Sequence, residues 1–339
     1  MKAVQIISPK SIEIVETKEP QLPSNGNGFV KVRMLRGCLC GSDMPFFSLN
    51  FDREPERAKS LIGELESGQD SYYPLLIGQS MHECVGRIVE SNSDQIKVGT
   101  LAIAGPPKMS GFQEYFCTRE ESVFPLPEGS VPVEQLLMSQ PLGTVIWAMR
   151  KLGNLFHSDC VVVGQGPMGQ LFAHMLSNLG ARTITVMDKI DERLSVSPKM
   201  RATHTVNVDR HDPIGAIKEI TDGRMADLVV EAVGHEQDTI DLCTALVKRQ
   251  GTILGFGVPE VSYGTKINYR ELFRKNITFI GSVGPEYRRD GSLARDMIVQ
   301  NRVNVSPIIT HSYPLEDAQI AYEQFANRKN GILKVIIEF

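Results

Sequence analysis

Residues 161–169, VVVGQGPMG, decide the fold class of this chain. An apolar run there leads into three spaced glycines, and an apolar helical pattern follows. In a strand–turn–helix of this kind the first glycine permits a tight turn, the second lets the backbone approach a pyrophosphate, and the third lets the helix pack closely on the strand. We therefore predict a dinucleotide-binding turn. Its expected cofactor contacts are Gly164, Gly166, Pro167, Met168 and Gly169.

Asp188 lies nineteen residues after the last of these glycines, at the end of a second β-like run. A carboxylate at that point accepts hydrogen bonds from the adenosine ribose and repels a 2′-phosphate, so NAD is expected in preference to NADP. Lys189 and Arg193 are also expected at the cofactor. They leave open the possibility that NADP binds, because a nearby cation accommodates its extra phosphate. Two later turns end strands on the same sheet edge. Their expected cofactor contacts are Val233, Gly234, Gly255, Phe256 and Gly257.

The composition is that of an ordinary globular chain of 339 residues, long enough for two domains. It has 42% hydrophobic residues, 22% charged residues and a net charge of −4, so there is no basic excess to neutralise nucleic acid. Neither a signal-peptide pattern nor an apolar run of membrane-spanning length occurs. We expect a cytoplasmic protein with no nucleic-acid or membrane partner. Its six scattered cysteines are expected to be reduced thiols or metal ligands.

The chain shows two sequence patterns, one in each half. Residues 1–130 contain short β-like runs separated by Gly, Pro and Asn, which is typical of a mostly β domain. From about residue 145, strands alternate with helical patterns, which implies βαβ crossovers and a parallel sheet. The fold class is therefore α/β, with a β-rich domain over 1–140 and a doubly wound Rossmann domain over 141–290. The tail, 291–339, offers a helix and a strand that are expected to complete the first domain.

Two upstream segments carry candidate metal ligands: GCLCGSD at 37–43 and MHECVG at 81–86. They contain thiol, hydroxyl, carboxylate and imidazole groups. Thiolate and imidazole suit zinc, and three protein ligands with an open position make zinc a Lewis acid. Each residue taken alone also has a structural explanation, as a buried thiol, a loop histidine or a turn aspartate.

The chain resembles the zinc-dependent medium-chain dehydrogenase/reductase family in four places. These are the two segments above, the mid-chain GQGPMG and the tail PLEDAQIAYE…KVII. The resemblance is to its alcohol and polyol branch, the sorbitol and threonine dehydrogenases. It implies a GroES-like catalytic domain interrupted by a Rossmann domain. It also implies hydride transfer between NAD and a secondary alcohol, polyol or sugar-like hydroxyl, and a homodimer or homotetramer, often joined through the Rossmann sheet edges.

The resemblance also assigns roles to residues of the two upstream segments. Cys40 matches the thiolate ligand and His82 the imidazole ligand of the metal. Glu83 matches a glutamate that binds the metal in some members and sits behind it in others. Asp43 matches the carboxylate that orients the histidine and fixes its tautomer. Ser42 matches the hydroxyl that passes the alcohol proton toward solvent.

Three departures from the family pattern qualify these expectations. Gln140 stands where polyol-type members have a glutamate, so that position is neutral, and whether it binds or weakens zinc stays open. Pro45 stands where many members have a relay histidine, so the proton must leave by another route. The cysteine-rich lobe of the structural zinc is missing, so we expect one catalytic zinc and no structural zinc.

The segment 46–73 lies between the candidate ligands and makes their interval longer than in the relatives. Apolar residues at helical spacing predict a surface helix within 52–67, begun at Pro55 and ended by Gly68. The segment could be a lid or an oligomer contact. Its three phenylalanines, Phe46, Phe47 and Phe51, could line an apolar pocket together with Trp147, which is better explained as a core residue.

Two other functions remain open at this stage. A zinc-free NAD(P)H-dependent reductase of enones or quinones could use the same scaffold, although such relatives lack the cysteine and histidine–glutamate set. A non-catalytic NAD-binding protein is the third possibility, and it draws slight support from Gln140 and Pro45.

Overall fold

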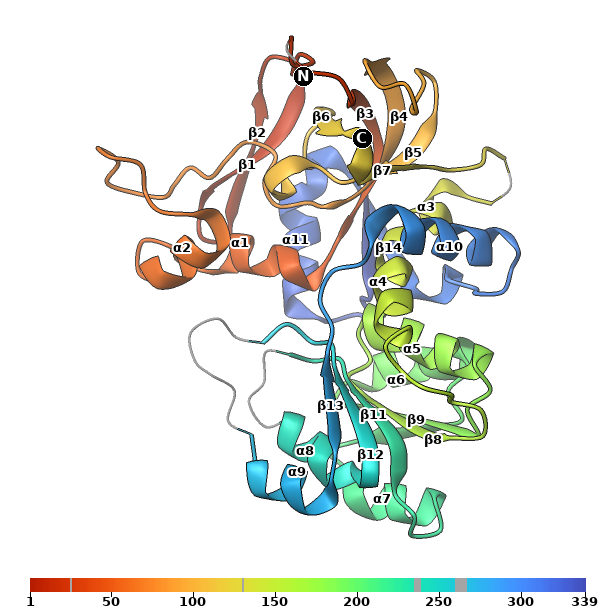
Figure 1. The fold of residues 1–339 in the computed structure, drawn as a ribbon. Coiled ribbons are helices and arrows are strands. Elements are labelled where there is room, and N and C mark those ends of the chain that lie inside the picture. Colours follow the sequence, from red (N-terminus) through yellow and green to blue (C-terminus); the bar gives the residue numbers. More distant parts are fainter. Residues whose placement is uncertain (25, 130, 235–238, 260–266) are drawn as a thin grey trace. The chain divides into compact units, whose positions relative to one another are not determined.

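The computed structural model describes residues 1–24, 26–129, 131–234, 239–259 and 267–339 (Figure 1). The chain divides into two compact units. Unit 1 comprises Met1–Gln140, Tyr287–Val299 and Ile309–Phe339, and unit 2 comprises Pro141–Glu286 and Gln300–Ile308. We expected the chain to return to the first domain at about residue 291. It returns at Tyr287, and a short stretch after Val299 belongs to unit 2 again.

Unit 1 is built on a seven-stranded sheet whose path runs β14-β15-β3-β4-β5-β7, with β6 also paired to β3, and on a separate hairpin, β1-β2. The strands are β1 (Lys2–Ser8), β2 (Ser11–Glu16), β3 (Phe29–Leu39), β4 (Glu83–Ser91), β5 (Leu101–Ala104), β6 (Tyr115–Arg119), β7 (Val123–Pro125), β14 (Ile309–Pro314) and β15 (Lys334–Glu338). The helices are α1 (Met44–Ser48), α2 (Pro55–Ile62), α3 (Val133–Leu137), α10 (Tyr287–Val299) and α11 (Ala318–Asn327).

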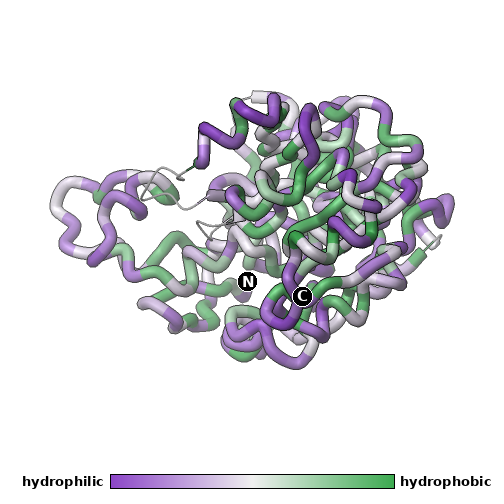
Figure 2. Tube along the Cα trace, turned by 90° about the horizontal axis from the view of Figure 1, so that it is seen from below, coloured by the Kyte–Doolittle hydropathy of each residue, from purple (hydrophilic) through white to green (hydrophobic). Residues whose placement is uncertain are grey.

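The core of unit 1 joins the start of the chain to its end. The strand residues Val32 and Val335 pack in one cluster with Tyr322 of α11. The Tyr322 ring stacks on Phe47 of α1, with 4.7 Å between the ring centroids. This contact holds α1, which follows the first candidate ligand, against the helix of the tail. Figure 2 shows apolar residues along the inner parts of the chain trace and hydrophilic residues on peripheral loops.

The segment 46–73 has a small core of its own. Phe46, Phe51 and Ala58 pack with residues of β1 and are almost wholly buried. The Asp52 carboxylate accepts hydrogen bonds from the Ser71 hydroxyl and the Tyr72 backbone N–H, both at 2.8 Å, which ties the two ends of the segment together. The first part of the segment is therefore packed onto unit 1, whereas most of 63–70 is exposed.

Two expectations for this segment need correction. The helix begins at Pro55 as expected but ends at Ile62, because Gly63 adopts a φ of 96° and stops it before Gly68. The three phenylalanines are at most 2% exposed and fill cores, Phe47 with Tyr322 and the other two in the segment's own cluster, so they are not exposed as an apolar pocket.

Unit 2 contains a six-stranded parallel sheet in the order β10-β9-β8-β11-β12-β13. Its strands are β8 (Asp159–Val163), β9 (Thr183–Asp188), β10 (His204–Asn207), β11 (Ala226–Glu231), β12 (Val247–Gly255) and β13 (Thr278–Gly281). Its helices are α5 (Pro167–Asn178), α6 (Asp191–Val196), α7 (Pro213–Ile220), α8 (Thr239–Leu246) and α9 (Tyr269–Lys275), and α4 (Ser139–Met149) leads into it from unit 1.

This strand order is the doubly wound arrangement in which the sequence direction reverses between β8 and β11. Every strand pair in the sheet is parallel, and β8 and β11 are buried apolar runs, as expected for a sheet covered on both faces. Ligands of such sheets bind outside the carboxyl ends of the strands at the reversal. The glycine turn after β8 lies at that point. Within the described ranges, none of the helices combines the length and apolar character needed to cross a bilayer.

Candidate functional site

Three candidate metal ligands converge in unit 1. One ligand atom each from Cys40, His82 and Glu83 lies within 4.8 Å of the other two. Cys40 follows the end of β3, and His82 and Glu83 stand at the start of β4, its antiparallel neighbour. Because Cys38 pairs with Glu83 in that ladder, residues more than forty positions apart in the chain meet at one end of the sheet.

Asp43 contacts two of these ligands, Cys40 and His82, and is fully buried. One carboxylate oxygen accepts the Cys40 backbone N–H at 2.7 Å, and the other lies 3.3 Å from His82 Nδ1. A hydrogen bond from Nδ1 to the carboxylate leaves Nε2 with its lone pair free for a metal. Asp43 therefore has the position of an orienting group.

Burial and neighbouring charges act in opposite directions on the pKa values of Asp43 and His82. Burial raises the pKa of the Asp43 carboxyl, against the opposing effect of His82. Burial lowers the pKa of His82, but Asp43 and Cys40 outweigh it and the net shift is upward, well above the ordinary range. A bound metal would remove this conflict, since it would take the deprotonated thiol and the neutral imidazole as ligands and offset the surrounding negative charge.

Glu83 has a partner that sequence reasoning missed. The Lys334 ammonium lies 2.5 Å from Glu83 Oε2, and each side chain is 1% exposed. Burial opposes the charge on Lys334, but the negative groups of Cys38, Glu83 and Cys40 raise its pKa above the usual range. A lysine among the apolar residues of KVII was the available signal, because a charged residue in a buried strand needs a counter-ion.

The remaining predicted residues of unit 1 differ in exposure. Ser42 is exposed in a 3-10 turn, Gly41–Asp43, between Cys40 and α1. Gln140 is 7% exposed in α4. The Tyr287 hydroxyl, which sequence reasoning did not single out, is buried without a hydrogen-bond partner among the described residues. Burial, with the charges of Cys84 and Glu83, raises the pKa of this phenol.

In unit 2 the three glycines of the turn are required for different reasons. Gly164 has a φ of 95°, and a Cβ there would lie 2.8 Å from Val233 Cγ2. A Cβ at Gly169 would overlap the carbonyl oxygen of Gly164, so this glycine lets α5 pack against the turn. A Cβ at Gly166 would meet only Arg193, at 4.0 Å. The space in front of Gly166 is therefore left open by the protein, as a bound pyrophosphate requires.

Asp188 is held firmly at the end of β9. One oxygen accepts the Gln165 N–H at 2.7 Å and the other accepts the Ile190 N–H at 2.9 Å. The Arg193 guanidinium lies 3.9 Å from the first of these oxygens, and Lys189 is exposed beside it. Carboxylate, cation and glycine turn thus lie together in unit 2. Pro167 and Met168, also predicted at the cofactor, form the first turn of α5.

A buried glutamate, Glu231, holds the turns after β11 and β12, and the sequence did not indicate this role. Glu231 Oε1 accepts the N–H groups of Val233 and Gly234, both at 2.8 Å, while its backbone carbonyl accepts those of Phe256 and Gly257. These four N–H groups are therefore not available as donors to a cofactor. Gly255 packs against Phe279, where a Cβ would lie 2.9 Å from the ring.

Comparison with known proteins relates the chain to dehydrogenases. The profile of zinc-binding dehydrogenases matches residues 167–299. Sorbitol dehydrogenase of Bacillus subtilis (strain 168) is 25% identical and covers 99% of this chain and 97% of its own length. L-threonine 3-dehydrogenase of Bacillus velezensis is 24% identical, with 94% of each chain covered. The crystal structure of galactitol-1-phosphate dehydrogenase from Escherichia coli superposes with a TM-score of 0.81 at 19% identity and covers 100% of both chains.

The chain is therefore similar to zinc-dependent dehydrogenases over nearly its whole length. Its relatives include the sorbitol and threonine dehydrogenases that the motifs indicated. The α/β fold class, a β-rich unit followed by a Rossmann sheet, is confirmed.

Proposed function

We propose that this protein is a zinc-dependent, NAD-linked dehydrogenase that oxidises a secondary alcohol, polyol or sugar-like hydroxyl, or reduces the corresponding carbonyl. The observation that carries the proposal is the convergence of Cys40, His82 and Glu83 within 4.8 Å, with Asp43 joining two of them. Similarity to enzymes named for sorbitol, D-xylulose and threonine supports hydroxyl oxidation.

The donor set suits zinc because it offers one thiolate, one imidazole and one carboxylate. Bound there, zinc would act as a Lewis acid that lowers the pKa of a substrate hydroxyl. Cys40 and His82 would hold it, and Asp43 would keep His82 in the tautomer that presents Nε2. Ser42 is exposed and can pass the hydroxyl proton to solvent, which Pro45 at the relay position cannot do.

We propose NAD as the cofactor in unit 2, whose nicotinamide supplies the hydride acceptor. The open space at Gly166 would admit the pyrophosphate against the N-terminus of α5. The two backbone hydrogen bonds to Asp188 hold a negative charge where a 2′-phosphate would have to lie. Arg193 offsets part of that charge, so we expect a preference for NAD that is finite.

We propose one catalytic zinc and no structural zinc. In the described parts of the chain, the cluster of Cys40, His82 and Glu83 is the one in which metal-binding side chains come close enough together. Cys84 is buried in the core of unit 1, and Cys117 lies on β6, beside the Lys31 and Glu90 charges.

We also propose a homodimer or homotetramer, with β13 at one interface. This strand is an edge of its sheet, and exposed backbone on an edge invites pairing with another chain. Large apolar side chains near it are exposed, including Val283 at 86% and Phe273 at 71%. A second copy of the chain would cover both features.

The proposal is tested by metal analysis and by NADH absorbance with a panel of polyols, sugars and secondary alcohols. We expect one zinc per chain and activity that is lost after dialysis against a chelator. Cys40→Ser and His82→Ala should lose zinc and turnover together, while Cys117→Ser, a thiol elsewhere in unit 1, should keep both.

Two results would replace this function by another. Turnover of enones or quinones without bound zinc would indicate a zinc-free reductase. Binding of NADH with no oxidation or reduction across the panel would indicate a non-catalytic NAD-binding protein.

A further inference from the structure

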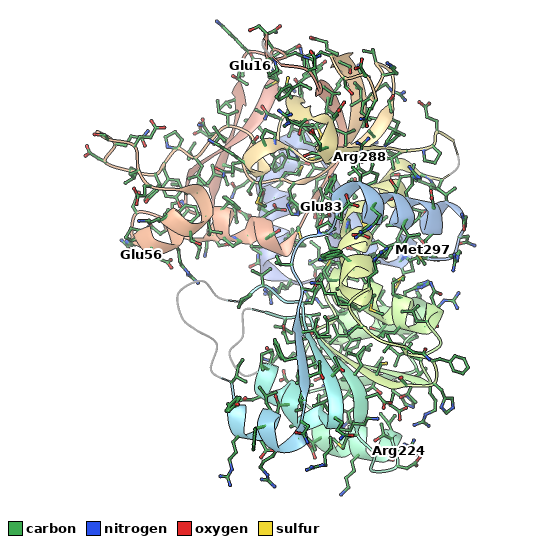
Figure 3. The ribbon with its side chains drawn as sticks, viewed as in Figure 1. Glu16, Glu56, Glu83, Arg224, Arg288 and Met297 are labelled. Atoms are coloured by element: carbon green, nitrogen blue, oxygen red, sulfur yellow. The ribbon has the colours of Figure 1, made fainter. Side chains whose placement is uncertain are left out.

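Lys334 is a buried cation placed against a candidate metal ligand. Its Nζ lies 2.5 Å from Glu83 Oε2 and 3.5 Å from the carbonyl oxygen of Leu39, and both charged side chains are 1% exposed. The two residues are 251 positions apart in the chain. Glu83 is labelled in Figure 3 within unit 1. An ion pair so fully desolvated is costly unless each charge is well compensated.

The sheet sets this arrangement. Strand β3 lies between β4 and β15, and Cys38 pairs with Glu83 on one side and with Ile336 on the other. Residues paired across an antiparallel ladder lie on the same face, and so do residues two apart on one strand. Lys334 and Glu83 are therefore on one face, at the end of the sheet where Cys40 leaves β3.

In this arrangement two cations, the Lys334 ammonium and a bound zinc ion, would compete for the Glu83 carboxylate. A zinc ion held by Cys40 and His82 would have an oxygen of Glu83 within reach, because one ligand atom of each residue lies within 4.8 Å of the other two. Lys334 already holds Oε2 of the same group. A carboxylate shared in this way can give the metal one oxygen but not two, and its hold on the metal is weakened by the neighbouring positive charge.

We propose that Lys334 competes with the metal for the Glu83 carboxylate and so keeps Glu83 a one-oxygen, exchangeable ligand. Lys334 is thus a positioning residue. This inference rests on the proposed zinc site and adds the group that determines how Glu83 uses it. An exchangeable Glu83 keeps a coordination position open for substrate, whereas a Glu83 bound through both oxygens would close it.

The test measures zinc affinity of the apo-protein by competition with a chromophoric chelator. Lys334→Met and Lys334→Gln remove the charge, and two replacements are used so that a folding defect in one leaves the other to be measured. We expect zinc to bind about tenfold more tightly, or more, to either variant than to the wild type, the scale on which groups behind a metal site act. Affinity that is unchanged or weaker in the folded variants would overturn the proposal.

Two control variants separate this role from the general effect of removing a buried lysine. Lys31 is also buried in unit 1 and pairs with Glu19 and Glu90 at 2.9 and 3.0 Å, at the far end of β3 from Cys40. Lys31→Met should leave zinc affinity within about twofold of the wild type. Lys334→Arg keeps the cation and should bind zinc no more tightly than the wild type. Tighter binding in either control would contradict the assignment.

The double variant Glu83→Gln/Lys334→Met tests whether the effect passes through Glu83. If Lys334 acts by holding this carboxylate, the gain from Lys334→Met should shrink to less than about threefold in the Glu83→Gln background. A gain that persists there would mean that Lys334 acts by its charge alone, and the proposal would fail.

The visible spectrum of the Co²⁺-substituted protein gives a readout independent of affinity. A second oxygen from Glu83 raises the coordination number, and absorption bands of Co²⁺ weaken as coordination rises above four. We expect weaker bands in Lys334→Met than in the wild type, and identical spectra would oppose the proposal. A wild-type protein that binds neither Zn²⁺ nor Co²⁺ would instead refute the proposed function itself.

Discussion

The glycine turn allows a prediction in which folding and cofactor binding respond separately. Gly166→Ala places a Cβ where the nearest protein atom is 4.0 Å away, on backbone with a φ of −63° that alanine readily adopts. At the N-cap of α5, alanine is worse than glycine by a few tenths of a kcal/mol or more. Replacing glycine by alanine also lowers the conformational entropy of the unfolded chain, which stabilises the folded state by about 0.4–1 kcal/mol. We expect the free energy of unfolding to stay within about 0.5 kcal/mol of the wild type.

The same substitution should damage cofactor binding, because the methyl group fills the space through which the pyrophosphate would approach the backbone. A loss of about 1.4 kcal/mol or more of binding free energy corresponds to at least tenfold weaker NADH binding. Gly169→Ala is the matched comparison. Its Cβ would overlap the Gly164 carbonyl oxygen, so it should destabilise the fold by about 1–3 kcal/mol or more.

Urea unfolding of the apo-protein and calorimetric titration with NADH measure the two quantities on one sample. The reasoning fails if Gly166→Ala binds NADH as tightly as the wild type, since the open space would then not be the pyrophosphate site. It also fails if Gly166→Ala unfolds as readily as Gly169→Ala, because the two positions would then be equally crowded.

Three further predictions concern packing, charge and assembly. A Cβ at Gly37 would overlap the buried Met81 Sδ, so Gly37→Ala should lower the free energy of unfolding by about 1–3 kcal/mol. In a Met81→Ala background this loss should be smaller by about 1 kcal/mol or more. If the effects of the two substitutions were strictly additive, this contact would be contradicted. Burial opposes the charge of Asp159, but Arg182 and other partners hold its pKa below the ordinary value. Its stabilising effect is therefore present at neutral pH, begins to be lost below the ordinary carboxyl pKa of about 4, and is gone once the pH lies below the lowered pKa of the folded protein. Asp159→Asn should be about 1–2 kcal/mol less stable at pH 7, and a difference that does not shrink as the pH falls below about 4 would refute the pairing. Phe273→Glu should lower the mass measured by light scattering if the β13 edge is an interface, and an unchanged oligomer would exclude this face.

Features that depend on local geometry were predictable. The glycine pattern after β8 and Asp188 at the end of β9 indicated a Rossmann turn, because a tight turn, a close helix contact and an acidic strand end each require particular residues at particular spacing. The helical spacing of the tail likewise predicted α11, whose Ala318, Ala321 and Tyr322 are buried.

Features that depend on where other segments lie were not predictable. The aromatic residues after Cys40 were considered for a pocket, whereas packing against β1 and α11 buries them. Glu231 could not be recognised as the acceptor of four backbone N–H groups, because the turns that it joins follow different strands.

By itself the sequence determined the Rossmann turn, because this turn depends on residue types at short spacing. It indicated the three candidate ligands only through the family resemblance of the two segments that contain them. Only the tertiary structure decided that Cys40 and the His82–Glu83 pair meet at one end of the sheet, and that Lys334 lies against Glu83. The physical reason is that strand register brings together residues distant in the chain. An ion pair between positions 251 residues apart leaves no spacing from which it could be read.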